Sequence, residues 1–308
     1  MAVFQGGRGL RLALLLICLM AAFWRPGPGP AAARVITDQV GRLVRVPDEP
    51  QRIIALAPSI TEIVFALGQG PRLRGVSNYS DFPGEALALP RIGPYPEPDL
   101  ERILGLNPDL CIGVKDHHPP QVLQRLDDLR VPVYLADPRN LEGVMDSVLG
   151  VGALLGVSPR AQELVAHMRR RVERVKSLVA QVPQRPRVFF QIGVNPLVAV
   201  GSNTFIHELI TTAGGENVTA GKVPYPQVSR EKILALGPEV IIITTMARGE
   251  IWARVQEDWA RWPQVPAVRN RRIHLVDSNL FDRPSPRLVD GLELLYGILH
   301  PPGGGQGK

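Results

Sequence analysis

The chain has 308 residues, of which 45% are hydrophobic and 21% are charged, and this composition excludes a collagenous or broadly disordered protein. A chain of this length accommodates about two domains of ~150 residues each. The net charge is +6, but the first 33 residues hold three arginines and no acid, so the remainder carries only +3. That excess is too small to indicate nucleic-acid binding, and no nucleic-acid partner is expected.

The N-terminal segment has the layout of a secretory signal peptide. Arginines precede an apolar run that ends at Trp24, and Ala31 and Ala33 form a small-residue cleavage pair. At about 13 residues the run is short for a membrane span. We therefore expect residues 1–33 to be removed and an exported chain to start near Arg34, with an uncleaved membrane anchor as the alternative.

The two cysteines are not expected to form a disulfide or to carry a lipid. Cys18 lies inside the apolar run and follows Ile17, where lipid attachment requires a small residue. Removal of the leader would leave Cys111 as the single cysteine of an exported chain. We interpret Cys111 as a small hydrophobic residue of a buried strand.

A first lobe is predicted for residues 34–139, with strands and helices that alternate as in an α/β fold. The polar–apolar alternation up to Val46 predicts a hairpin, and Ser59 with Glu62 predicts a capping box for a helix over 60–67. The other expected elements are strands over 53–56, 73–77, 110–112 and 132–136 and helices near 101–106 and 120–129.

One stretch of this lobe recurs later in the chain. ERILGLNPDLCI, from Glu101 to Ile112, matches EKILALGPEVII, from Glu231 to Ile242, position by position. Each copy predicts a short helix that ends at Asn107 or at the equivalent Gly237, followed by a proline and a buried strand. The repeat therefore predicts two pseudo-equivalent lobes with parallel sheets.

The lobes are expected to be joined by a rigid helical linker over residues 140–183. Apolar residues recur there at helical spacing, and a break at Gly156-Val157-Ser158-Pro159 separates two helices. The second helix is long enough to span about 30 Å. The second lobe is predicted for 184–300 and opens with the strand RVFFQI from Arg187, and residues 301–308 are expected to be a frayed tail.

Signatures of catalysis and of metal binding are missing from the sequence. No G-x-S-x-G, H-E-x-x-H, P-loop or G-x-G-x-x-G motif lies on a strand-to-helix turn, so we do not expect an enzyme. The adjacent pair His117 and His118 is the one suggestive metal-ligand pair, but two side-by-side histidines on a loop are better interpreted as solvated. No resident metal or cofactor is predicted.

Aromatic residues recur in proline-stiffened loops at the expected mouths of the two lobes. Any one of them could be a surface residue without function, but together they would line a cleft that suits a large, flat, partly apolar ligand. Asn279 and Arg283 could supply polar contacts at the same mouth. The aromatic candidates are Tyr79, Phe82, Tyr95, Tyr225 and Phe281.

These loops resemble those of the periplasmic cobalamin-binding proteins of ABC importers, a family of helical-backbone, or class III, substrate-binding proteins. The similarity extends from about residue 52 to 299. The segments that carry it are SNYSDFP (77–83), VFFQIGVNP (188–196), GGENV (214–218), VPYPQVSRE (223–231) and FDRPSP (281–286).

The resemblance implies two α/β lobes that bind cobalamin or a related corrinoid between them, and a monomer that delivers it to the transmembrane subunits of an ABC permease. It places Tyr79, Tyr95, Tyr225, Phe281 and Arg283 at corrinoid contacts, and Asn279 beside them. Glu101 and Glu231 fall where the family presents one carboxylate per lobe to arginines of the permease.

The sequence also departs from the pattern of this family. Tyr95 and Tyr225 stand where the best-known member has tryptophan, Asn279 replaces an acid, and Leu280 replaces a tryptophan. An iron-siderophore or haem therefore stays open as the ligand. A corrinoid-modifying enzyme of the same compartment is a further alternative, against which the missing catalytic motifs count.

Overall fold

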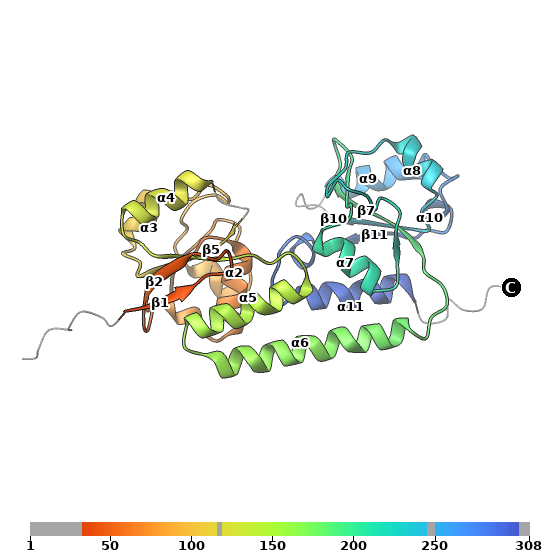
Figure 1. The fold of residues 1–308 in the computed structure, drawn as a ribbon. Helices are drawn as coiled ribbons and strands as arrows, with labels where there is room; N and C mark the ends of the chain where they lie inside the picture. Colours follow the sequence, from red (N-terminus) through yellow and green to blue (C-terminus); the bar gives the residue numbers. More distant parts are fainter. Residues whose placement is uncertain (1–32, 116–118, 245–249, 302–308) are drawn as a thin grey trace, which may run out of the picture.

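The computed structural model describes residues 33–115, 119–244 and 250–301, which form two α/β lobes joined by a pair of helices (Figure 1). Residues 1–32 of the predicted leader, the pair His117 and His118, and the tail after Pro301 lie outside the described residues. The fold class predicted from the sequence is confirmed.

The N-terminal lobe begins with the predicted hairpin and continues as a parallel sheet. The hairpin pairs β1 (Ala33–Thr37) with β2 (Leu43–Pro47) in antiparallel register. The sheet has the order β4-β3-β5-β6, and every neighbouring pair is parallel. Its strands are β3 (Ile53–Ala55), β4 (Leu73–Val76), β5 (Leu110–Val114) and β6 (Val133–Ala136). The helices are α2 (Pro58–Ala66), α3 (Leu100–Gly105) and α4 (Pro120–Asp128), with 3₁₀ turns η1 (Gly70–Arg72) and η2 (Gly84–Ala88).

The capping box predicted for helix α2 is wrong. The helix begins at Pro58 with Ala57 as its N-cap, and no side chain caps it. Proline is well suited to this first helical position, because it has no N–H group to satisfy and its φ angle is already helical. Ser59 therefore lies within the helix, and the Glu62 carboxylate is directed elsewhere.

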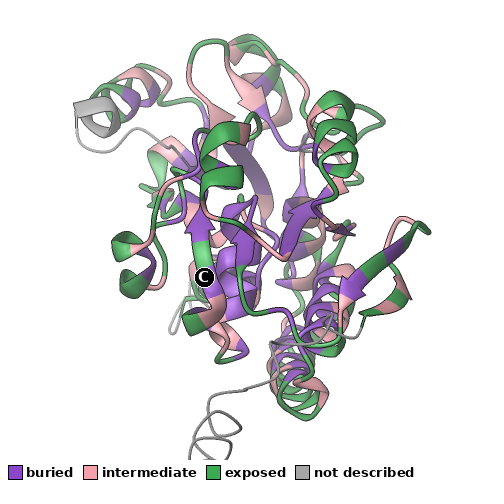
Figure 2. Cartoon of the chain, turned by 90° about the vertical axis from the view of Figure 1, so that its left-hand side faces the viewer, coloured by how far each residue is buried: buried purple, intermediate pink, exposed green. Residues whose placement is uncertain are grey.

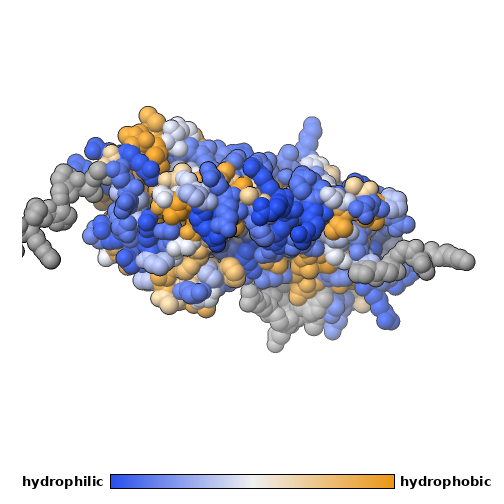
Figure 3. Space-filling view, turned by 90° about the horizontal axis from the view of Figure 1, so that it is seen from below, coloured by the Kyte–Doolittle hydropathy of each residue, from blue (hydrophilic) through white to orange (hydrophobic). Residues whose placement is uncertain are grey.

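The predicted helical linker consists of α5 (Leu141–Leu154) and α6 (Ser158–Val179). The Asn140 side chain caps α5 by accepting a hydrogen bond from the Gly143 N–H at 2.7 Å. Gly156, with a φ of 73°, makes the turn between the helices. Helix α6 has 22 residues, spans about 33 Å at 1.5 Å per residue, and passes beneath both lobes (Figure 1). Seen from below, this side of the molecule is predominantly hydrophilic along its middle (Figure 3).

The C-terminal lobe repeats the design around a sheet of order β11-β10-β7-β8, in which β10 is parallel to both of its neighbours. The short strand β8 is antiparallel to β7, and β9 pairs with β7 as a parallel branch; neither was predicted. The strands are β7 (Arg187–Gly193), β8 (Val198–Ala199), β9 (Glu216–Asn217), β10 (Val240–Thr244) and β11 (Ile273–Val276). The helices are α7 (Phe205–Thr212), α8 (Arg230–Leu236), α9 (Glu250–Ala260), α10 (Pro266–Arg269) and α11 (Leu288–Leu299), with the 3₁₀ turn η4 (Ser278–Leu280).

The sequence repeat corresponds to a structural repeat, as predicted. After α3 and after α8, the chain turns through a left-handed residue, Asn107 with φ 48° and Gly237 with φ 56°. It then enters β5, which pairs with β3, or β10, which pairs with β7. Asparagine and glycine tolerate the left-handed conformation better than other residues, which explains why these two types occur at the C-terminal ends of the two helices.

The acid after each proline of the repeat performs the same structural role in both lobes. The Asp109 carboxylate accepts the Arg52 N–H at 2.9 Å, and the Glu239 carboxylate accepts the Arg187 N–H at 2.9 Å. In each case the carboxylate anchors the start of the neighbouring strand. The repeat is therefore an architectural unit in addition to any function of its first residue.

The hydrophobic core has one part that is shared by both lobes and one further part in each lobe. The shared cluster includes Ile53 and Ile112 of the first sheet, Val165 of α6, and Phe190 and Leu292 of the second lobe. Figure 2 shows the buried strands enclosed by helices whose outer faces are exposed. Because α5, α6 and α11 contribute apolar side chains to this cluster that both lobes share, we expect only a small hinge motion. Within the described residues, no helix combines the length and apolar character needed to cross a membrane.

The contact between the two linker helices supplies a stability test. A Cβ atom added at Gly152 of α5 would overlap the Ala161 side chain of α6, whereas one added at the exposed Gly297 of α11 would meet nothing within 4 Å. Gly297→Ala should therefore raise the free energy of unfolding by about 0.5–1 kcal/mol through helix propensity. Gly152→Ala should lower it by at least about 1 kcal/mol, because overpacking outweighs that gain. Urea denaturation measures both, and stabilisation by both substitutions would contradict the tight α5–α6 contact.

Candidate functional site

The two lobes meet in a network of charged groups around Arg283, which lies between η4 and α11. Its Nη1 donates to Glu62 Oε1 of α2 at 3.0 Å and to Asp81 Oδ1 at 2.7 Å. Its Nη2 donates to the Tyr79 carbonyl oxygen at 2.8 Å. Tyr79 and Asp81 belong to the loop after β4, so one side chain of the second lobe holds both a helix and a loop of the first.

Glu62 is the buried centre of this network. Its side chain is 2% exposed, and its second oxygen accepts a hydrogen bond from the Ser285 hydroxyl at 2.6 Å. Arg287 Nη1 lies 3.5 Å from Glu62 Oε1. Burial raises the pKa of Glu62, and the bonds from Ser285 and Arg283 oppose that rise.

The loop over residues 77–82 is held against α2 by a second set of polar contacts. The Ser80 hydroxyl lies 2.9 Å from the Thr61 hydroxyl and 3.0 Å from the Ser77 hydroxyl. Arg91 Nη1 donates to the carbonyl oxygens of Ser77 at 3.0 Å and Ser80 at 2.7 Å. This loop follows the carboxyl end of β4, where ligands bind in open α/β sheets, and its backbone is fixed on both sides.

Two aromatic side chains of this loop remain open to solvent beside the charged network. Tyr79 is 46% exposed and Phe82 is 43% exposed. The Arg287 guanidinium lies 3.9 Å from the centroid of the Phe82 ring, a cation–π distance. Tyr79, Phe82 and the Arg287 guanidinium therefore lie together at the junction of the lobes.

The third exposed aromatic residue, Tyr225, lies on the C-terminal lobe near the same network. It is 47% exposed, and its pKa is raised by burial of its hydroxyl and by the negative charge of Asp282. Asp282 precedes Arg283 and keeps exposed surface, but protein atoms crowd its carboxyl group, and this desolvation raises the pKa of Asp282 to about 6. The effect of Asp282 on this pKa indicates that the Tyr225 hydroxyl lies near the Arg283 segment.

The other predicted ligand contacts lie deeper in the lobes. Tyr95 is partly buried and packs against the shared core, and burial raises its pKa. Asn279 is partly buried in η4, where its N–H donates to Asp277 Oδ1 at 3.0 Å. Phe281 is fully buried, with its ring centroid 5.5 Å from that of Phe190 in an edge-on contact. Phe281 is therefore a core residue, and its prediction as a ligand contact is corrected.

The two repeat glutamates are exposed at equivalent positions. Glu101 lies in the first turn of α3, which Asp99 caps, and Glu231 lies in the first turn of α8, which Ser229 caps. The pKa of Glu231 is lowered by a hydrogen bond from its own backbone N–H and by another from Ser229. Both carboxylates face solvent and are available to a partner.

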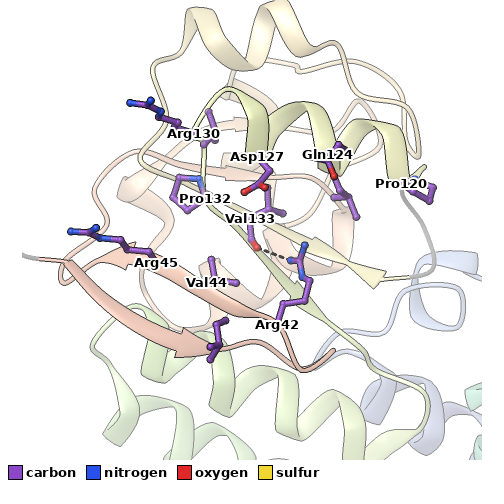
Figure 4. Close-up of a pocket in the computed structure, with 12 residues that line it drawn as sticks. Arg42, Val44, Arg45, Pro120, Gln124, Asp127, Arg130, Pro132 and Val133 are labelled. Carbon is purple, nitrogen blue, oxygen red and sulfur yellow. Dashed lines mark hydrogen bonds between the residues drawn. The ribbon is translucent and has the colours of Figure 1, made fainter.

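Four surface cavities lie among the described residues, and residues from a single lobe line each of these four. The cavity in Figure 4 has a volume of about 670 Å³ and lies between β2 and α4 at the outer end of the N-terminal lobe. Three arginines line it, Arg42, Arg45 and Arg130, and Arg42 donates to the Val133 carbonyl oxygen at 2.8 Å. A second cavity, of about 520 Å³, adjoins Glu231. None of these cavities contains the predicted ligand contacts.

Sequence reasoning did not identify Glu62, Ser285 and Arg287 as parts of the site. The spacing of Glu62 from Ser59 fits a capping box, so the sequence pattern already offers a local role for this carboxylate. Its partners lie more than 220 residues further along the chain, so local spacing carries no signal for them. Within the described residues, no group of three potential metal ligands converges.

Comparisons with known proteins identify relatives over most of the chain. A family model described as periplasmic binding protein matches residues 53–280. A vitamin B12-binding protein of Vibrio cholerae is 32% identical over 255 residues, which cover 82% of this chain and 90% of that protein. A crystal structure of a periplasmic vitamin B12-binding protein of the same species superposes with a TM-score of 0.71 at 32% identity, covering 81% of this chain and 96% of that one. A periplasmic haem-binding protein of Roseiflexus superposes with a TM-score of 0.72 at 29% identity, covering 81% and 99%.

Proposed function

Because the chain belongs to the periplasmic binding protein family, whose members are binding proteins and not enzymes, we propose that it captures cobalamin or a close corrinoid for import. In this proposal the ligand lies between the lobes and is delivered to the transmembrane subunits of an ABC permease. Residues 34–139 and 184–300 form the two lobes, and residues 140–183 join them.

The observation that carries the proposal is the junction around Arg283. Exposed aromatic side chains, Tyr79 and Phe82 of the first lobe and Tyr225 of the second, flank a network whose arginine already has carboxylate partners. Such a surface suits a large ligand with apolar ring edges and neutral amides, which gains affinity mainly from desolvation. Tyr95, Arg283 and Asn279 complete the proposed set of contacts.

Glu101 and Glu231 are proposed as docking carboxylates for the permease. They occupy equivalent exposed positions, one on each lobe, so a partner that binds both can sense the relative position of the lobes. The proposed location is periplasmic or at the cell surface, after removal of the leader. Retention of the leader as an anchor would tether the same lobes to the membrane.

Haem is the second candidate ligand. Tyrosine is an established axial ligand of haem iron, and Tyr79 presents an exposed phenol beside an arginine at the junction. The similarity to the haem-binding protein of Roseiflexus is close to the similarity to the vitamin B12-binding protein of Vibrio cholerae.

The absorption spectrum of the bound ligand separates these alternatives. The purified protein is incubated with cyanocobalamin and with ferric haem, passed through a desalting column, and its visible spectrum is recorded. We expect the corrinoid spectrum to elute with the protein, and mass analysis to recover cyanocobalamin unchanged. If only the haem spectrum elutes with the protein, the ligand is haem and not cobalamin. Recovery of a chemically altered corrinoid would indicate an enzyme.

A further inference from the structure

Four ion-paired side chains at the junction of the lobes balance one another in charge. Arg283 and Arg287 contribute two positive charges, and Glu62 and Asp81 contribute two negative charges within 3.5 Å of them. Arg283 uses both terminal nitrogens on the N-terminal lobe, and its side chain is only 11% exposed. The four side chains are therefore formally neutral as a group, and Arg283 is already neutralised where a ligand would meet it.

Glu62 makes the larger contribution to this balance because it is the buried acid. Its side chain is 2% exposed, whereas that of Asp81 is 43% exposed and is screened by water. Arg287 depends on the same carboxylate: its Nη1 is buried without a hydrogen bond, and Glu62 Oε1, 3.5 Å away, is its ion-pair partner. Removal of the Glu62 charge would leave the two arginines without their buried acid, and only the more exposed Asp81 and Asp282 would remain near Arg283.

This balance bears on the choice between the two candidate ligands. Haem carries ionised propionate groups that need a cation, whereas cobalamin presents mainly neutral amides around its corrin ring. A carboxylate brought to this junction would meet Glu62 as a like charge and would find the nearest arginines already paired. A neutral amide would not incur that repulsion.

We propose that Glu62 is a specificity-determining residue that makes the junction reject anionic ligands and thereby favours a neutral corrinoid over haem. The inference rests on the proposed function, since it assumes that the ligand binds beside Arg283. Glu62 acts through the arginines that it pairs and does not itself need to touch the ligand.

The test compares wild-type protein with Glu62→Gln in titrations with cyanocobalamin and ferric haem. Glutamine keeps the shape and can still bond to Ser285 and Arg283, but it removes the negative charge. We expect haem affinity to rise on the order of tenfold, because the arginines become available to a propionate. Cyanocobalamin affinity should change by less than about threefold, because a neutral ligand gains no comparable attraction.

Glu293→Gln is the matched control. Glu293 also pairs with an arginine, Arg171, but on the side of α11 that faces α6, and its substitution changes the net charge by the same amount. It should alter neither affinity. If circular dichroism shows that Glu62→Gln does not fold, Asp81→Asn removes the second carboxylate of the same network and should raise haem affinity by a smaller factor, because Asp81 is screened by water; no rise would count against the inference.

The outcomes distinguish this inference from the proposed function. Wild-type protein that binds cyanocobalamin, with haem affinity unchanged by Glu62→Gln, would overturn the role of Glu62 alone. Wild-type protein that binds haem tightly and cyanocobalamin not at all would overturn both. A selective gain of haem affinity in Glu62→Gln, absent in Glu293→Gln, supports the inference.

Discussion

Replacement of both Glu101 and Glu231 by arginine should abolish uptake by vesicles that contain the cognate permease. The two carboxylates are exposed on equivalent helices of the two lobes, and each reversal would set a cation against the arginines expected on the permease. Like charges placed opposite each other in an interface cost several kcal/mol, so we expect transport to fall by at least about 100-fold. Ligand affinity should stay unchanged, because neither residue belongs to the Arg283 network.

The control for this experiment reverses two exposed glutamates of the linker helix, Glu163 and Glu173. Their side chains are 69% and 67% exposed, and they pair with Arg160 and Lys176 of the same helix. Glu163→Arg with Glu173→Arg changes the net charge by the same amount and should leave uptake intact. Uptake that survives the reversal of Glu101 and Glu231 would reduce the sequence repeat to its architectural role.

Arg283→Ala should weaken both the fold and ligand binding. The substitution removes three charge-assisted hydrogen bonds between the lobes and leaves Glu62 with Ser285 and the more distant Arg287. Truncation of one partner of a buried, hydrogen-bonded charge pair costs about 2–5 kcal/mol, and we expect a loss of unfolding free energy in that range. Cyanocobalamin affinity should fall at least about tenfold, because the loop that carries Tyr79 loses its anchor to the second lobe.

Arg171→Ala separates loss of stability from loss of the site. Arg171 joins α6 to Asp290 and Glu293 of α11, so it is also an arginine between two carboxylates, but it does not contact the loops of the junction. Arg171→Ala should lower the denaturation midpoint of the protein and leave its ligand affinity unchanged. Equal losses of affinity in Arg171→Ala and Arg283→Ala would show that the Arg283 network acts only through global stability.

The architecture could be predicted from the sequence because its signals are local. The turn residues Asn107 and Gly237, the prolines that follow them and the apolar runs after these all act within a few residues. Strands β8 and β9 were missed because each is only two residues long, which is too short for a periodic sequence pattern. The N-terminus of α2 was misplaced because a capping-box spacing also fits two residues inside a helix.

The site was less predictable because its contacts join distant parts of the chain. Tyr79 and Arg283 were found through the resemblance of their loops, and the structure brings them together through a backbone carbonyl. Phe281 belongs to the same kind of aromatic loop motif, yet its ring is fully buried against Phe190, which residue type alone does not reveal. Glu62 emerges only when its buried carboxylate is paired with arginines of the other lobe.

Calorimetric titration of the purified protein with cyanocobalamin tests the account most directly. We predict saturable binding of one cyanocobalamin per protein and a much weaker response to ferric haem or a ferric siderophore under the same conditions. No heat with cyanocobalamin at high micromolar concentration, together with a clear signal from haem or the siderophore, would contradict the assignment of a corrinoid ligand.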